Sequence, residues 1–406
     1  MRLLTVVTVV LGSVPVIAAP ASAAGMCDRP SSFTAQAQAD LLKVGLLDLR
    51  PLGLNLPQVV GLTLASSRAG MATDAAVRSN ASAQYIDAAV AGLKLPAGPL
   101  EARVAQQAPP THQDAVRNNA LSVDLGLAKV GTGDLMAHAE WAEGMACGMQ
   151  LGRAGSSSAA ILEATVLPGS GGAMVKASRN LSSQAGTAIL ARKGHIAAAA
   201  GAGVGLAKLE LFGAGAAAVT VRVVEPPQLM AIATGRKETS LVEYKAPLLE
   251  ISGPGIGTRQ LSGMGQTIDL PLPTTALGTV LNGLSLGQVA GLTQLGEATT
   301  VRLTIGNLEQ QITDGKVSAS AASLRLQLLA TGASLLDLSV GLLQVSASAP
   351  QLTDPAPPSD CGTPGCKLPV TGLNVGLAAG VGILLFIIGR FLLVLAGRRT
   401  SAPRRP

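Results

Sequence analysis

The chain has few residues of the kinds that carry out catalysis, so each can be weighed separately. A GxSxG pattern at residues 283–287 matches the nucleophile turn of α/β-hydrolases. That fold places its catalytic histidine after the serine, whereas the only histidines, His112, His138 and His195, all precede it. We therefore interpret residues 283–287 as a turn rich in glycine and serine.

The remaining fragments of catalytic motifs are incomplete. His138 and Glu140 are spaced like the H-x-E half of a zinc deaminase site, but the P-C-x-x-C half is absent. The glycines within residues 201–205 lack the spacing of a dinucleotide fingerprint. Only 2% of the residues are aromatic, so little is available to stack on a sugar in a glycosidase cleft. We expect no catalytic residue, no metal site and no cofactor.

The most specific pattern lies in the last tenth of the chain. It consists of Leu368, Pro369, Val370, Thr371 and Gly372. Residues 373–397 follow directly, with few polar interruptions, and are long enough to cross the roughly 30 Å hydrocarbon core as one helix. The tail, residues 398–406, then carries Arg398, Arg399, Arg404 and Arg405, which favour a cytoplasmic location for it.

These three parts, in this order, resemble the LPxTG sorting signal of proteins that sortases link to the cell walls of Gram-positive bacteria. The bias toward Ala, Gly and Leu resembles proteins of high-GC members of that group. The resemblance covers residues 368–406 only. The alternative is a single-pass membrane anchor that contains the pentapeptide by chance.

The resemblance implies a role for each residue of the motif. A sortase transpeptidase would attack the carbonyl of Thr371, release Gly372 and all that follows, and join the Thr371 carboxyl covalently to peptidoglycan. Leu368 and Pro369 would be recognition residues, and Val370 would occupy the variable position. The precursor would span the plasma membrane once, and the mature protein would lie in the wall on the outer surface.

The N-terminus predicts export. Arg2 precedes an apolar run at residues 3–19, and the small residues that follow predict signal-peptidase cleavage between Ala23 and Ala24. Lipidation at Cys27 is the weaker alternative, because the residue before a lipobox cysteine is small and this chain has Met26 there. Residues 1–23 are therefore interpreted as a signal peptide.

The two signals account for the basic balance of the chain. The whole chain has 30 Lys and Arg against 24 Asp and Glu. Arg2 and the five arginines beyond Thr371 leave with the signals, so the mature part carries equal numbers of basic and acidic residues. A neutral chain with few aromatic residues has no reason to bind nucleic acid.

The cysteines of an exported chain are expected to form disulfides. The four residues are Cys27, Cys147, Cys361 and Cys366. Three pairings are open, and we favour Cys27–Cys147 with Cys361–Cys366, because the latter two frame a turn-prone Gly-Thr-Pro-Gly loop. Their spacing matches no common zinc site.

The region between the two terminal signals is predicted to consist mainly of β-strands. Apolar and polar residues alternate at residues 121–127, 207–211, 219–223, 301–305, 324–328 and 336–340. This period of two predicts half-buried strands, whereas the Ala-rich stretches at residues 32–42 and 72–91 are candidate helices. We expect a mainly β protein of antiparallel sheets packed sandwich-like, with an elongated form as one option, a signal helix before it and a transmembrane helix after it.

The mature chain divides into segments of different composition. Residues 24–225 and 226–349 are two β-rich parts, and the proline pair at residues 226–227 is either a boundary or a loop within one domain. Residues 350–367 are a Pro-rich linker with the small cysteine loop. An extended proline-rich chain rises about 3.1 Å per residue, so the stalk before that loop would be only about 30 Å long.

The function that fits these features is that of a non-enzymatic adhesive or structural protein of the cell surface, whose ligand the residues do not name. The alternative is a wall-attached hydrolase or wall-remodelling enzyme. It would require a polar cleft with paired Asp or Glu residues, or a serine together with one of the three histidines.

Overall fold

The computed structural model describes most of the chain between residues 32 and 352. The described residues are 32–48, 50, 61–88, 102–126, 128–169, 172–213, 218–253, 255, 257–271, 299–330 and 333–352. Within them the protein is mainly β, and every strand pairing is antiparallel, as predicted. No α-helix occurs in these ranges, and one short 3-10 turn, η3, spans Glu143–Cys147.

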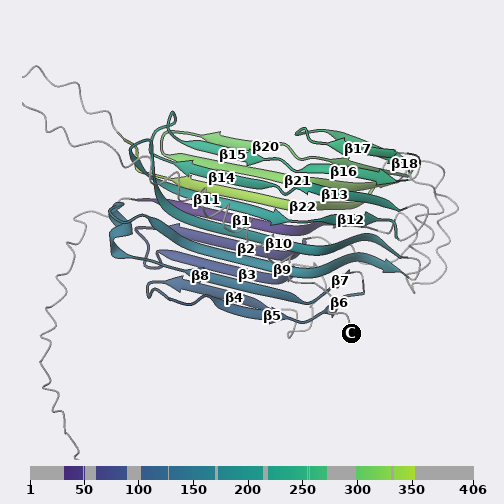
Figure 1. Cartoon of the computed structure of the whole chain (residues 1–406), viewed down its shortest axis with the longest axis horizontal. Coiled ribbons are helices and arrows are strands. Elements are labelled where there is room, and N and C mark those ends of the chain that lie inside the picture. Colours follow the sequence, from purple (N-terminus) through teal and green to yellow (C-terminus); the bar gives the residue numbers. More distant parts are fainter. Residues whose placement is uncertain are drawn as a thin grey trace, which may run out of the picture.

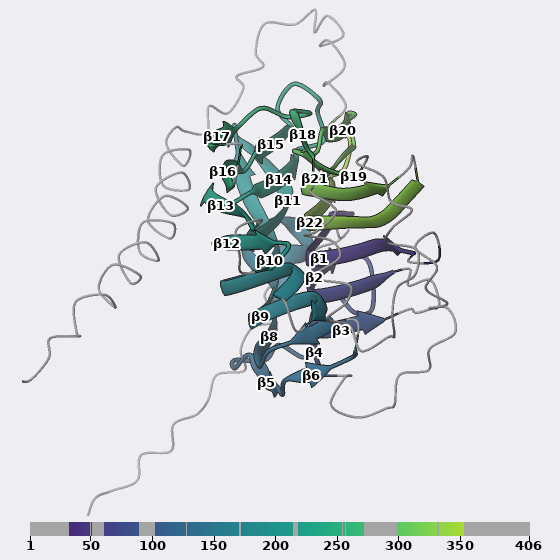
Figure 2. The ribbon, with the colours of Figure 1, turned by 90° about the vertical axis from the view of Figure 1, so that its right-hand side faces the viewer.

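The strands form two sheets, which lie as two layers in Figure 2. Sheet A contains β1 (Thr34–Leu47), β2 (Leu62–Ala72), β3 (Ser79–Ala88), β4 (Arg103–Ala108), β18 (Thr267–Pro271), β19 (Thr299–Thr304), β20 (Leu308–Ile312), β21 (Lys316–Ala330) and β22 (Ala333–Ser348). Its order is β18-β19-β21-β22-β1-β2-β3-β4, with β20 beside the other part of β21. The first strand therefore pairs with the last one in the middle of the sheet (Figure 1).

Sheet B is built around its two longest strands. It contains β5 (Val116–Ala120), β6 (Val123–Asp124), β7 (Ala128–Val130), β8 (Gly133–Ala139), β9 (Gly152–Gly169), β10 (Gly172–Arg192), β11 (His195–Gly205), β12 (Lys208–Leu211), β13 (Val219–Glu225), β14 (Gln228–Ala233), β15 (Leu241–Lys245), β16 (Leu248–Gly253) and β17 (Gly257–Leu261). One part of β10 is followed in the sheet by β11, β14 and β15, and the other part by β12, β13, β16 and β17.

The proline pair at residues 226–227 is a loop between β13 and β14, which belong to the same sheet. Strands from both sides of this loop also pair in sheet A, where β1 lies against β22. A single hydrophobic cluster runs from Phe33 to Ala349 and includes residues of both sheets. Residues on both sides of the proline pair therefore contribute to the same two sheets and to the same hydrophobic cluster.

The two candidate helices are wrong. Residues 32–42 lie mostly in β1, and residues 72–91 contain all of β3 and the last residue of β2. On β1, Ala35, Ala37 and Ala39 are buried while Gln36 is exposed, which is the period of a strand. The helix propensity of alanine is a weak preference, and pairing with two neighbouring strands overrides it.

Along a line across the middle of sheet A, the alternation of inward-facing and outward-facing residues shifts by one position. On this line, five adjacent strands each have two consecutive buried residues: Tyr85–Ile86, Leu64–Ala65, Leu41–Leu42, Val340–Gly341 and Ser323–Leu324. The backbone turns there through left-handed φ values of 49° at Ala65 and 66° at Gly341. A Cβ at Gly341 would also lie 2.7 Å from Ser323 Oγ, so this position requires glycine.

This line divides the sandwich into two halves. The near half holds the beginning of β1 and the end of β22, and its inward-facing residues are mostly small, as on β11 with Ala198, Ala200 and Ala202. The far half holds the other ends of these strands, and its inward-facing residues are mostly Leu, Val and Ile. Its buried residues include Leu42, Leu209, Leu211, Leu249, Ile251, Leu326, Leu336 and Leu338.

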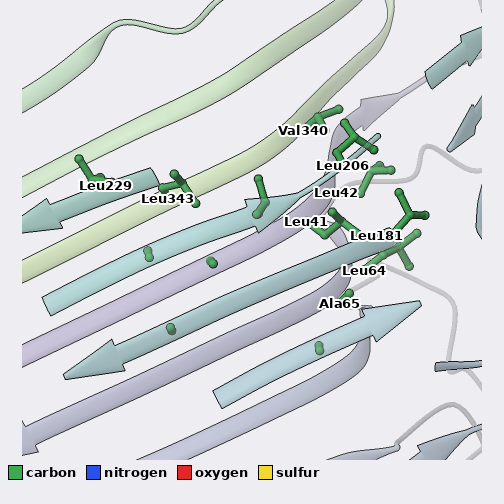
Figure 3. Packing of buried hydrophobic residues seen from close by; sticks show 14 of the residues in the cluster. Leu41, Leu42, Leu64, Ala65, Leu181, Leu206, Leu229, Val340 and Leu343 are labelled. Atoms are coloured by element: carbon green, nitrogen blue, oxygen red, sulfur yellow. The ribbon is translucent and has the colours of Figure 1, made fainter. Parts of the chain in front are cut away.

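The halves are also joined differently across the two sheets. In the near half, hydroxyl groups of one sheet reach the other: Ser67 Oγ lies 2.7 Å from Ser183 Oγ, and Ser157 Oγ donates to the Arg68 carbonyl at 2.9 Å. Toward the far half, long apolar side chains such as Leu42, Leu206 and Val340 fill the space between the sheets (Figure 3). Small residues thus allow close approach in one half, and branched residues separate the sheets in the other.

Candidate functional site

A groove lies on the outer face of sheet A, over the near half. Its volume is about 640 Å³. It crosses six strands, β3, β2, β1, β22, β21 and β20, close to the end where β1 begins and β22 ends. The polar residues that line it are Gln36, Gln38, Arg68, Asn80, Glu309, Gln310, Gln311, Ser318, Ser320, Gln344 and Ser346.

Strand register arranges these side chains in two rows that run across the sheet. The first row contains Gly70, Gln36, Ser346, Ser318 and Gln311, each opposite the next. The second row contains Arg68, Gln38, Gln344, Ser320 and Glu309. Neighbours along one strand are two residues apart, so the rows are separated by about 7 Å. Between the rows, the inward-facing residues of β2, β1, β22 and β21 are apolar, namely Ala69, Ala37, Val345 and Ala319. On β20 the corresponding residue is the polar Gln310.

One end of the groove depends on the absence of a side chain. A Cβ at Gly70 would lie 2.8 Å from Asn80 Oδ1, so the amide of Asn80 lies directly over this glycine. Asn80 pairs with Gly70 across β2 and β3. A larger residue at position 70 would therefore displace Asn80 from its place at the end of the first row.

A buried carboxyl group holds one of the amides in position. Gln38 Nε2 donates a hydrogen bond of 2.9 Å to Asp40 Oδ2. Asp40 is only 1% exposed, and its Oδ1 accepts no hydrogen bond from a described residue. Burial raises the pKa of Asp40, and the hydrogen bond from Gln38 and the charges of Arg68 and Lys43 oppose this. With one amide hydrogen engaged in this way, Gln38 keeps its carbonyl oxygen for the groove.

Most of the other amides in the groove are unused. Gln36, Gln310, Gln311 and Gln344 make no side-chain hydrogen bond to any part of the chain that the structure describes. Each primary amide offers one carbonyl acceptor and two N–H donors. The groove thus presents donors and acceptors side by side, which is the arrangement that a ligand rich in hydroxyl or amide groups requires.

The histidines do not form a site together. His138 Nε2 lies 3.0 Å from the His112 carbonyl oxygen, and His138 Nδ1 lies 3.1 Å from Glu140 Oε1. Because a carbonyl only accepts, Nε2 must donate to it and is not free to take a proton from a hydroxyl group. His195 begins β11, which β9 and β10 separate from His138 on β8.

Groups of metal-ligating residues and long apolar helices can be sought only within the described ranges. There, no group of three or more His, Cys, Asp or Glu residues could hold a metal ion. No helix in these ranges is long and apolar enough to span a membrane. The predicted transmembrane segment, residues 373–397, lies outside them.

The structure places only one residue of the predicted sites. Cys147 ends the turn η3 and is disulfide-bonded. The other predicted sites lie outside the described residues: Ala23, Ala24, Cys27, Cys361, Cys366, the sorting motif at residues 368–372, and Arg398, Arg399, Arg404 and Arg405. The turn predicted at residues 283–287 also lies outside them. The pairing of Cys27 with Cys147 therefore stays a prediction.

Sequence reasoning missed the groove. The signal for it is a pair of polar residues two positions apart on each of three strands: Gln36 with Gln38, Ser318 with Ser320, and Gln344 with Ser346. Such pairs show that one face of a strand is polar. They do not show that β22 lies between β1 and β21, which is what brings the pairs together.

Comparisons with known proteins assign the chain to no family. No model of a protein family matches the chain, and no curated protein or solved structure is similar to it.

Proposed function

We propose that the protein is an exported surface protein that a sortase joins covalently to peptidoglycan through Thr371, and that its β-sandwich is a non-enzymatic binding module. The observation that carries the proposal is the order of the motif at residues 368–372, the apolar run and the terminal arginines. The signal peptide and the transmembrane helix would serve only the precursor.

The way in which the chain leaves the sandwich supports this proposal. After β22, Ala349 N donates to the Gly315 carbonyl at 3.1 Å, and Leu352 N donates to the Gly235 carbonyl at 3.2 Å. The linker toward Thr371 therefore starts from a point that two turns fix, one from each sheet. Since β22 is an inner strand of sheet A, a pull on the linker would load a strand with neighbours on both sides.

The polar groove supports the binding role of the sandwich. Apart from that of Gln38, its glutamine amide groups are exposed and have no hydrogen-bond partner among the described residues, and amide hydrogen bonds position a ligand without any covalent chemistry. The hydrolase alternative has less support, because both ring nitrogens of His138 already face oxygen acceptors.

Cell fractionation tests the anchoring part of the proposal. Wild-type protein is expected in the wall fraction that lysozyme releases, and Thr371→Ala is expected in the membrane fraction or the medium. Thr363→Ala, which changes a threonine outside the motif, is the matched control and should behave like wild type. If the wild type and Thr371→Ala are both found in the membrane fraction, the pentapeptide is accidental and the protein is a single-pass membrane protein.

A further inference from the structure

The charge of the groove restricts its ligand. It contains one cation, Arg68, and one anion, Glu309. Arg68 Nη2 lies 3.6 Å from Asp87 Oδ2, and Glu309 Oε2 lies 3.5 Å from the Ser320 hydroxyl group. The remaining polar lining is uncharged, so the groove has no excess charge with which to select an ion. Its ligand is therefore expected to be neutral and polar.

The floor of the groove argues against a peptide. It is the face of a sheet whose inner strands β1, β2 and β22 already pair on both sides, so an added strand could not pair along the floor. Of the strands that the groove crosses, only β20 has an unpaired edge among the described residues, and that edge lies at the end of the two rows. The apolar residues between the two rows, Ala37, Ala69, Ala319 and Val345, are buried and point inward. No pocket is left for the apolar side chains of a peptide, whereas hydroxyl groups would find an amide or a serine in either row.

The position of the groove indicates where its ligand lies. Gln344 and Ser346 lie near the end of β22, a few residues before the chain leaves the sandwich at Ala349. The stalk that follows is only about 30 Å long if residues 350–360 are extended. The groove is thus at the end of the domain that would face its own anchoring point.

We infer that the groove on the outer face of sheet A binds an uncharged glycan of the cell wall to which the protein is attached. This inference rests on the proposed function, because the location of the ligand follows from the anchor. Glycan hydroxyl and acetamido groups would lie along the two rows, with Gln36 beside Ser346 in the first row and Gln344 beside Ser320 in the second.

The groove has no aromatic side chain, so each binding event is expected to be weak, with a dissociation constant near the millimolar range. Covalent attachment to the wall increases the occupancy of such a weak site. It raises the local concentration of the glycan to about millimolar, at which a site of millimolar affinity is substantially occupied. Binding of this kind would orient the sandwich on the wall.

The test measures binding of a tetramer of N-acetylglucosamine, which is uncharged, to the full-length chain in detergent by calorimetry or ligand-observed NMR. Wild type is expected to bind with millimolar affinity. The double variant Gln36→Ala/Gln344→Ala should bind about five- to tenfold more weakly, because each amide contributes a neutral hydrogen bond. Gln260→Ala, which removes an exposed amide on β17 of sheet B, should bind like wild type.

Two further measurements distinguish a loss of glycan binding from a loss of folding. Thermal unfolding of each variant shows whether it is folded, and Ser346→Leu offers a second way to obstruct the groove and should also weaken binding. The inference is overturned if wild type does not bind the tetramer at millimolar concentration, or if the folded groove variants bind as wild type does. Fractionation of Thr371→Ala decides the anchoring separately, so either idea can fail while the other stands.

Discussion

The near and far halves of the sandwich solve the same packing problem in different ways. In the far half, branched residues such as Leu326 and Leu338 are fully buried between the sheets. In the near half, alanines and serines bring the sheets close enough for Ser67 and Ser183 to share a hydrogen bond. The small residues of the core are thus concentrated beneath the polar groove, where the two sheets form a thin double layer.

The largest effect should come from removing a long side chain in the far half. Leu338→Ala deletes a side chain with 0% exposure, and the free energy of unfolding should fall by about 2–5 kcal/mol because a cavity remains. Denaturant unfolding measures the change. Leu121→Ala, at a position that is 67% exposed, is the control and should change stability by less than about 0.5 kcal/mol. Equal losses at both positions would contradict the account of the far half.

The converse substitution should disturb the near half. Ala200→Leu adds a long side chain at a position with 1% exposure where the sheets are close, and should lower the free energy of unfolding by about 1–3 kcal/mol through overpacking. Ala105→Leu, at an exposed position of β4, is the matched control. A neutral or stabilising Ala200→Leu would show that the near half contains spare space.

The hydrogen bond between the sheets should contribute less. Ser67→Ala leaves the Ser183 hydroxyl buried without this partner and should lower the free energy of unfolding by about 1 kcal/mol. In a double-mutant cycle, the Ser67→Ala/Ser183→Ala variant should lose less than the sum of the two single losses. Additive losses would mean that the two hydroxyl groups are not coupled and that the sheets are farther apart than described.

The smallest effect should be a dependence on pH in the near half. Because burial raises the pKa of Asp40 in the folded protein, its contribution is fully present below the ordinary value of 3.8 and is lost as the pH rises through the folded pKa. Stability of the wild type should therefore decline over that range relative to Asp40→Asn, in which the group does not titrate. Parallel stability curves for the two proteins from about pH 3 to pH 7 would contradict the raised pKa.

The sequence predicted the fold class because alternation is visible over short segments. The predicted segments 207–211 and 219–223 correspond to β12 (Lys208–Leu211) and β13 (Val219–Glu225). Alternation was harder to follow in the longest strands, since the buried positions on β1 change from odd to even numbers at Leu41–Leu42. Alanine at three of those buried positions also made β1 resemble a helix.

The groove could not be predicted, for a different reason. Its polar residues come from strands that are far apart in the sequence, such as Gln36 on β1 and Gln344 on β22. Nothing local in either segment specifies the other as its neighbour, and register decides which side chains share a row. The sorting signal, by contrast, is contiguous, so the sequence alone supports a specific hypothesis for it.

Mass spectrometry of the C-terminal peptide of the protein released from the wall by lysozyme tests the central claim most directly. If a sortase cleaves the chain after Thr371, this peptide ends at Thr371 and carries a covalently bound fragment of peptidoglycan. A peptide that continues through Gly372 into the apolar run would contradict this claim, because the protein would then have kept its membrane segment and would not be attached to the wall through Thr371.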